Sequence, residues 1–208
     1  MRSLAYQDTE ELGGLASVLA LQKRDHVKLD RLLGELDAAH PAQQDAVLRR
    51  IYRLVFPHAF AEECVLWPAI RKVLPDGERL TLQIEEEHQE VNELVTSLEG
   101  MNADDPGRSA TLDRLIQVLR EDVRDEEDVL LPRLQERLSR RRLQILGLAW
   151  EAVRQLAPTR AHPVVARRPP GNVIAAVPLA VIDRCRDGVE LVLQTGPPRG
   201  ASCWPGLA

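Results

Sequence analysis

Apolar side chains recur every three or four residues between residues 15 and 156, a spacing that predicts amphipathic α-helices. Prolines and glycines interrupt the pattern and are expected to end each helix. We expect four helices of similar length, over about residues 15–36, 43–66, 77–99 and 109–130. Pro41, Pro68, Gly100 and Pro132 follow them, and Pro57 is expected to kink the second helix.

The chain after the fourth helix divides into two further segments. Residues 136–157 are expected to form an additional helix, within an amphipathic pattern that runs over 133–156. Residues 158–208 are a Pro- and Gly-rich tail in which only about 178–194 regain an amphipathic pattern. We therefore expect an all-α fold, with a four-helix bundle over residues 1–135 followed by extra C-terminal helices.

Composition and charge narrow the possible classes of partner. Only 3% of the residues are aromatic, and the abundance of Leu, Ala, Glu and Arg favours helices. The net charge of −5, with both signs mixed along the chain, argues against a nucleic-acid binder, which needs a basic surface. No segment approaches the ~20 apolar residues of a membrane span, and the N-terminus lacks the apolar run of a signal peptide. We therefore expect a cytoplasmic protein.

The three cysteines, Cys64, Cys185 and Cys203, are far apart and form no CxxC pair. Their spacing indicates neither a disulfide framework nor a thiolate zinc site. The expected role of Cys64 is that of a small buried apolar side chain.

An internal repeat relates the first two expected helices to the second two. The motif His-x-x-x-Glu-Glu-x-Val-Leu-x-Pro at 58–68 returns at 122–132, with Asp122 in place of the first His. In the same way, residues 25–36 and 87–98 each begin with an acidic residue followed by His, and both continue with apolar residues at the same spacing. The four expected helices are therefore two copies of one helical hairpin.

The repeat places metal-ligating side chains on common helix faces. Residues four apart on an α-helix are about 40° from eclipsed, whereas residues five apart are about 140° away. His58 therefore shares a face with Glu62, while Glu63 and Glu127 are expected to point toward solvent or a neighbouring helix. The pair on the second helix is expected to face the matching pair on the fourth, and the first and third helices each add one His. Together they predict a metal site formed by His26, His58, Glu62, His88, Asp122 and Glu126. Imidazole with carboxylate suits iron, manganese or zinc, and carboxylates from two helices can bridge two ions.

The same residue types also occur where no metal is expected. A single His on an apolar helix face is more often a core residue, but burying the whole set without a cation would be costly. His40 and His162 have no partner at ligand spacing, so we expect both at the surface. Residues 85–87 are expected to form a solvated acidic face, in which Glu87 could accept a hydrogen bond from an imidazole.

In this order and spacing, these residues resemble the hemerythrin HHE cation-binding family over residues 15–135. Flanking segments at 66–68 and 74–77 resemble bacterial members, and 182–187 resembles a C-terminal extension of actinobacterial ones. The resemblance implies an antiparallel, up-down-up-down four-helix bundle with a non-haem di-iron centre. It also implies that dioxygen, nitric oxide or peroxide is the small-molecule partner.

Asp122 departs from the family pattern, which usually has His at this position. Asp is shorter than His and anionic, so it either draws its helix closer or reaches the metal through water. Added negative charge favours the ferric state and lowers the reduction potential. Alternatively, a coordination position stays open for peroxide or water. Both outcomes make reversible oxygen transport a weaker hypothesis than oxidant chemistry.

Three functional hypotheses remain from the sequence. The first is a hemerythrin-like iron protein, with two irons, that binds or senses a small oxidant. The second is an enzyme that decomposes peroxide at the same iron site. The third is a metal-free interaction protein with a decayed site, whose C-terminal helix docks a partner protein or a second copy of the chain.

Overall fold

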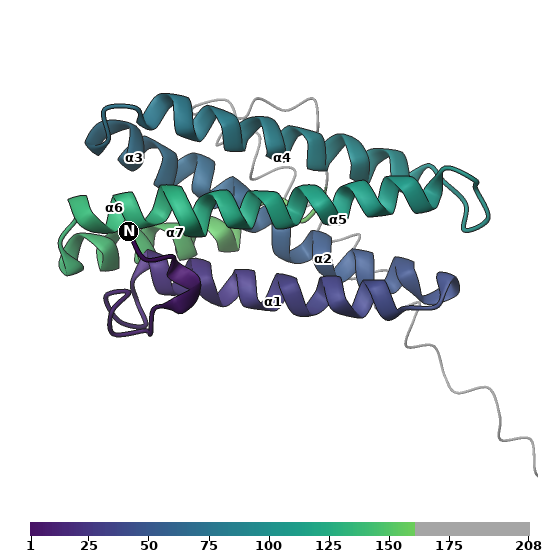
Figure 1. Cartoon of the computed structure of the whole chain (residues 1–208), viewed down its shortest axis with the longest axis horizontal. Coiled ribbons are helices and arrows are strands. Elements are labelled where there is room, and N and C mark those ends of the chain that lie inside the picture. The colour runs from purple at the N-terminus through teal and green to yellow at the C-terminus, as the bar shows by residue number, and fades with distance from the viewer. Residues whose placement is uncertain (161–208) are drawn as a thin grey trace, which may run out of the picture.

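The computed structural model describes residues 1–160, and within that range it contains helices and no strands. The long helices α1, α2, α4 and α5 run side by side along the molecule, and α3 and α6 extend α2 and α5 (Figure 1). The bounds are α1 Val18–Ala38, α2 Pro41–Ala61, α3 Trp67–Val73, α4 Gly77–Glu99, α5 Arg108–Asp125, α6 Leu131–Arg137 and α7 Arg140–Leu156. The expected antiparallel four-helix bundle is confirmed, and none of these helices is long and apolar enough to cross a membrane.

The predicted helix ends at Pro68 and Pro132 are wrong. Each proline lies in the first turn of a following helix, α3 or α6, where its missing N–H is not needed. A π-helical segment precedes each proline, Glu62–Leu66 before α3 and Glu126–Leu130 before α6. The wider π turn takes up one extra residue and lets the helix continue past the proline.

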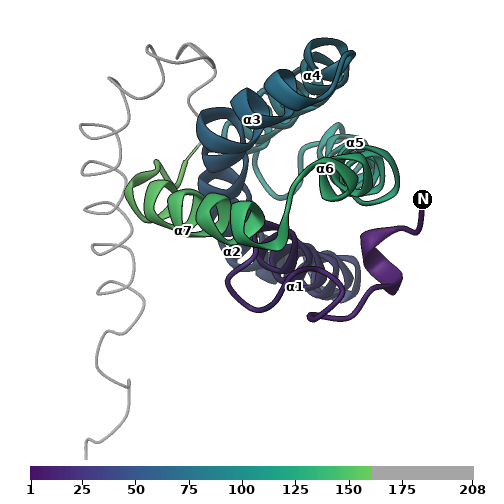
Figure 2. The ribbon, with the colours of Figure 1, turned by 90° about the vertical axis from the view of Figure 1, so that its left-hand side faces the viewer.

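The amphipathic pattern over 133–156, in which one additional helix was expected at 136–157, is divided between two helices in the structure. The backbone of Leu138 is extended, so α6 ends at Arg137 and α7 begins at Arg140. Helix α7 lies outside the four-helix bundle, beside α2 and α1 (Figure 2). The tail helix expected at about 178–194 lies outside the described residues.

The buried apolar side chains of the bundle form two separate clusters. One cluster fills the half of the bundle where α1 meets α2 and α4 meets α5, and includes Leu33, Ile51 and Leu115. The other joins α3, α6, α7 and the N-terminal segment, around Trp67 and Trp150. Between the two clusters lies a layer of buried polar side chains.

Helix α7 approaches the start of α1 closely at Gly147. A Cβ atom added to Gly147 would overlap the carbonyl oxygen of Ala16 and crowd the amide of Val18. The nearest atoms all belong to the backbone, so no flexible side chain can move aside. The small residue at this position therefore allows α7 to pack on the bundle.

Gly147→Ala is expected to lower the free energy of unfolding by about 1–3 kcal/mol, because overpacking against backbone forces α7 outward. The matched control is Gly34→Ala on α1, where an added Cβ meets nothing within 4 Å and a gain of about 0.5–1 kcal/mol is expected. Denaturant unfolding followed by circular dichroism measures both. Equal effects of the two substitutions would contradict the close approach.

Candidate metal centre

The polar layer between the two apolar clusters brings all six predicted ligand residues together. His26 comes from α1, His58 from α2, His88 from α4 and Asp122 from α5. Glu62 and Glu126 are the first residues of the two π-helical segments. All are buried except Asp122, which is partly exposed.

These residues form two groups, each of which could hold a metal ion. In the first group, His26, His58, Glu62 and Glu126 each offer one ligand atom, and these atoms lie within 4.8 Å of one another. In the second group, His88, Asp122 and Glu126 do the same. Glu126 belongs to both groups, so two ions held there would share its carboxylate.

The carboxylate of Glu62 also faces both groups. Its Oε1 lies 3.1 Å from Nε2 of His58, and its Oε2 lies 3.6 Å from Nε2 of His88. Each of its two oxygens therefore points at an imidazole of a different group. Glu62 and Glu126 therefore each lie within reach of both groups.

The other ring nitrogen of two imidazoles is hydrogen bonded to a buried glutamate. Nδ1 of His26 lies 2.9 Å from Oε1 of Glu127, and Nδ1 of His88 lies 3.0 Å from Oε1 of Glu63. A carboxylate accepts only, so Nδ1 carries a proton, and Nε2 is the atom that would present a lone pair to a metal ion at the centre of the layer. Such outer carboxylates orient the imidazole ligands of metal sites.

The positions of Glu63 and Glu127 show which of the two expected directions, solvent or a neighbouring helix, is correct. Both side chains are buried and reach a neighbouring helix, so the alternative that they point to solvent is wrong. Because each lies in a π-helical segment, consecutive glutamates can both face the interior. The repeated Glu-Glu pair was the available signal for this role.

Two other expectations need correction. Glu85 was placed on a solvated face, but it is buried and its Oε1 accepts a hydrogen bond of 2.5 Å from Arg71. Cys64 is half-buried, rather than buried, on the π-helical segment after α2. His40 is exposed as expected, and His162 lies outside the described residues.

His58 is supported from α1 and α7. Its Nδ1 lies 3.6 Å from Oδ2 of the buried Asp25, and the fully buried Trp150 meets its ring edge-on, at 5.3 Å between centroids. Burial raises the pKa of Asp25, but the neighbouring His58 and the hydrogen bond from Arg24 lower it more, so this pKa is well below its usual value. Arg154 lies over the Trp150 ring and 4.0 Å from Asp25. The amphipathic pattern of α7 did not predict this contribution.

The buried carboxylates carry more negative charge than their hydrogen bonds account for. Both oxygens of Glu62, both of Glu126 and Oδ1 of Asp122 are buried without a hydrogen-bond partner among the described residues. Such groups are costly unless a cation or proton compensates them. The imidazole and carboxylate donors fit iron, which would satisfy these oxygens together with the Nε2 lone pairs.

The pKa values of the layer reflect the same excess of negative charge. Burial lowers the pKa of His26, but the neighbouring carboxylates of Glu126 and Glu127 raise it to about 9. Burial also lowers the pKa of His88, but the charge of Asp122 and the hydrogen bond to Glu63 raise it to about 10. Burial and the charge of Glu126 raise the pKa of Asp122 well above its usual value. The layer therefore attracts positive charge.

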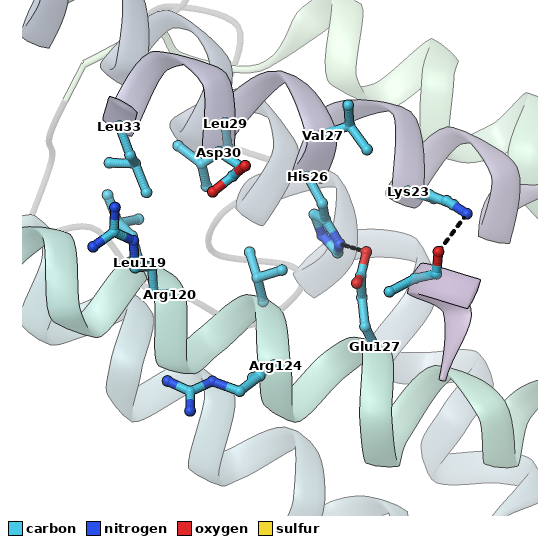
Figure 3. Close-up of a pocket in the computed structure, with 12 residues that line it drawn as sticks. Lys23, His26, Val27, Leu29, Asp30, Leu33, Leu119, Arg120, Arg124 and Glu127 are labelled. Carbon is cyan, nitrogen blue, oxygen red and sulfur yellow. Dashed lines mark hydrogen bonds and ion pairs between the residues drawn. The ribbon is translucent and has the colours of Figure 1, made fainter. Parts of the chain in front are cut away.

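A cavity of about 450 Å³ opens between α1 and α5 and reaches the outer side of His26 (Figure 3). Its apolar wall includes Leu33, Leu119 and Val123. The hydrogen-bonded pair His26 and Glu127 forms another part of the wall. The cavity thus leads from the surface to the edge of the polar layer.

The bundle and its buried His and carboxylate layer define a helical protein with groups that could hold a metal ion. Residues 17–134 match the hemerythrin HHE cation binding domain. The match covers more than half of the chain, so the chain belongs to the hemerythrin HHE family. Members of this family bind metal cations, typically iron.

Two curated relatives show detectable similarity. An uncharacterized hemerythrin-like protein of Schizosaccharomyces pombe is 29% identical over 134 residues, which are 64% of this chain and 66% of the relative. A DNA nickase of Nostoc sp. is 27% identical over 118 residues, 56% of this chain and 33% of the nickase. The chain thus spans slightly less than two thirds of the first relative and a third of the second. No solved structure matches.

Glu127→Ala is expected to weaken metal binding about 10–100-fold, because the Nδ1 proton of His26 loses its acceptor. The control is Asp128→Ala, which removes the next carboxylate along the chain at an exposed position. Competition against a chelator of known affinity measures the dissociation constants of both variants. If the two variants bind metal equally well, the hydrogen bond to Glu127 has no part in holding the site.

Proposed function

We propose that this chain is a cytoplasmic non-haem di-iron protein that binds or senses a small oxidant, with peroxide or nitric oxide favoured over stored dioxygen. The proposed ligands are the six residues of the polar layer. The observation that carries this proposal is the pair of ligand groups that share Glu126, with the two oxygens of Glu62 directed one to each group. The unpartnered buried carboxylate oxygens support it further, since without a metal ion the layer has to hold protons on its imidazoles and carboxylates to compensate them.

Iron bound at this site would supply coordination and one-electron chemistry for a small ligand. The protein side chains prepare the place for it. Glu127 and Glu63 keep the Nε2 atoms of His26 and His88 directed inward. The apolar clusters cover the layer on two sides.

Asp122 directs this chemistry away from oxygen carriage. As an anionic ligand in the place of a neutral imidazole, it would add negative charge beside bound iron and stabilise the ferric state. Reversible oxygen binding requires easy return to the ferrous state, so reaction with peroxide or nitric oxide fits better. The similarity to a DNA nickase supports no nucleic-acid function here, because it spans a third of that protein and this chain has a net charge of −5.

The direct test is metal analysis of protein from iron-replete cells, followed by anaerobic addition of hydrogen peroxide to the reduced protein. We expect two irons per chain, oxidised in proportion to the peroxide added. Continuous release of dioxygen would instead assign the peroxide-decomposing enzyme. Purification without metal would favour the metal-free interaction protein and contradict the proposal.

Glu126→Ala is expected to abolish iron binding at both positions, since Glu126 belongs to both ligand groups. The control is again Asp128→Ala, with iron content expected to be unchanged. Iron per chain, measured on folded protein, distinguishes the two variants. Retention of both irons by Glu126→Ala would remove Glu126 from the ligand set.

Val123→Trp is expected to slow the reaction with peroxide several-fold without changing the iron content, because the larger side chain fills the cavity between α1 and α5. Leu82→Trp adds the same ring to an exposed position on α4 and is the control. Stopped-flow spectroscopy measures the bimolecular rate constants. Equal rate constants for the two variants would show that the oxidant enters elsewhere.

A further inference from the structure

The two ligand groups of the polar layer are chemically unequal. The first group offers two imidazoles, His26 and His58, with the carboxylates of Glu62 and Glu126. The second group offers one imidazole, His88, with Asp122 and Glu126, and the second oxygen of Glu62 lies 3.6 Å from His88. One position is therefore balanced between nitrogen and oxygen donors, and the other is rich in oxygen.

The surroundings of the two groups differ in the same direction. Asp25, beside His58, is accompanied by cations: Arg24 lies 2.9 Å and Arg154 4.0 Å from its carboxylate. In the internal repeat, Glu87 corresponds to Asp25 and Asp122 corresponds to His58. Glu87 has one buried oxygen without a partner, and the neutral amide of Gln83 lies 3.5 Å from its other oxygen. The second group thus has fewer compensating positive charges.

Donor type affects which divalent ion a site prefers. Imidazole suits iron and later transition metals, whereas carboxylate suits manganese and other harder ions. Manganese binds more weakly than iron to most sites, and nitrogen donors widen this gap. Replacing an imidazole by Asp122 should therefore reduce the preference for iron at the second position only.

We propose that the two positions bind different metals: the His26 and His58 position selects iron, whereas the position of His88 and Asp122 accepts manganese as well as iron. The centre can then assemble as a mixed iron and manganese pair whose composition follows the supply of the two metals. This inference rests on the proposed binding of two ions. It goes beyond that proposal because it assigns a metal preference to each position.

The test uses the full chain, stripped of metal and reloaded without oxygen in equal concentrations of Fe²⁺ and Mn²⁺. Metal analysis gives the composition, and anomalous diffraction above and below the iron and manganese edges gives the position of each ion. We expect iron at the His26 and His58 position and manganese in a substantial fraction of molecules at the other. Raising the Mn²⁺ concentration should increase manganese at that position alone.

Asp122→His supplies the matched variant, because it restores an imidazole in the second group. It should bind iron at both positions and lose most of its manganese. Asp128→His adds the same residue at an exposed position and should keep the mixed composition. Circular dichroism verifies that both variants fold. If Asp122→His does not fold, the metal composition of the unaltered chain decides the question.

Each outcome separates the inference from the function on which it rests. Iron at both positions of the unaltered chain, with no manganese, would overturn the inference and leave the di-iron proposal standing. Manganese divided equally between the positions would also overturn it. Binding of neither metal would contradict the proposed function itself.

Discussion

Burial of several carboxylates in one layer of a helical bundle is the constraint on which this structure depends. Glu62 and Glu126 are almost completely buried, at 0% and 1% exposure, between two apolar clusters. Buried charge of one sign is unfavourable unless opposite charge lies beside it. Protonated imidazoles can supply that charge, and so can a metal ion that the neutral imidazoles help to bind. The rest of the fold places these groups within reach of one another.

The sequence predicted the bundle and the membership of its polar layer because both depend on spacing. A residue pair four apart shares a helix face in any α-helix, and the repeat indicated that two such pairs face each other. The predicted helix ends at Pro68 and Pro132 failed for a local reason. A π-helical segment lies before each proline. The spacing of the apolar side chains does not indicate the extra residue that such a segment contains.

The supporting contacts around the layer were harder to predict, because they join elements that are distant along the chain. Glu63 and Glu127 were given two possible directions, and only the arrangement of neighbouring helices decided between them. Helix α7 was expected as an amphipathic helix, but its pattern did not say which surface it covers. In the structure it brings Trp150 against His58 and Arg154 toward Asp25, so this helix outside the bundle takes part in the site.

The most direct test of this account is the stability of the protein as a function of free Fe²⁺ concentration, measured without oxygen by thermal unfolding. If a cation compensates the buried carboxylates, each bound ion should stabilise the folded chain by about 2.7 kcal/mol at 100 times its dissociation constant. The unfolding temperature should then rise steadily with added iron. An unfolding temperature that does not respond to iron, in protein first stripped of metal, would contradict the account.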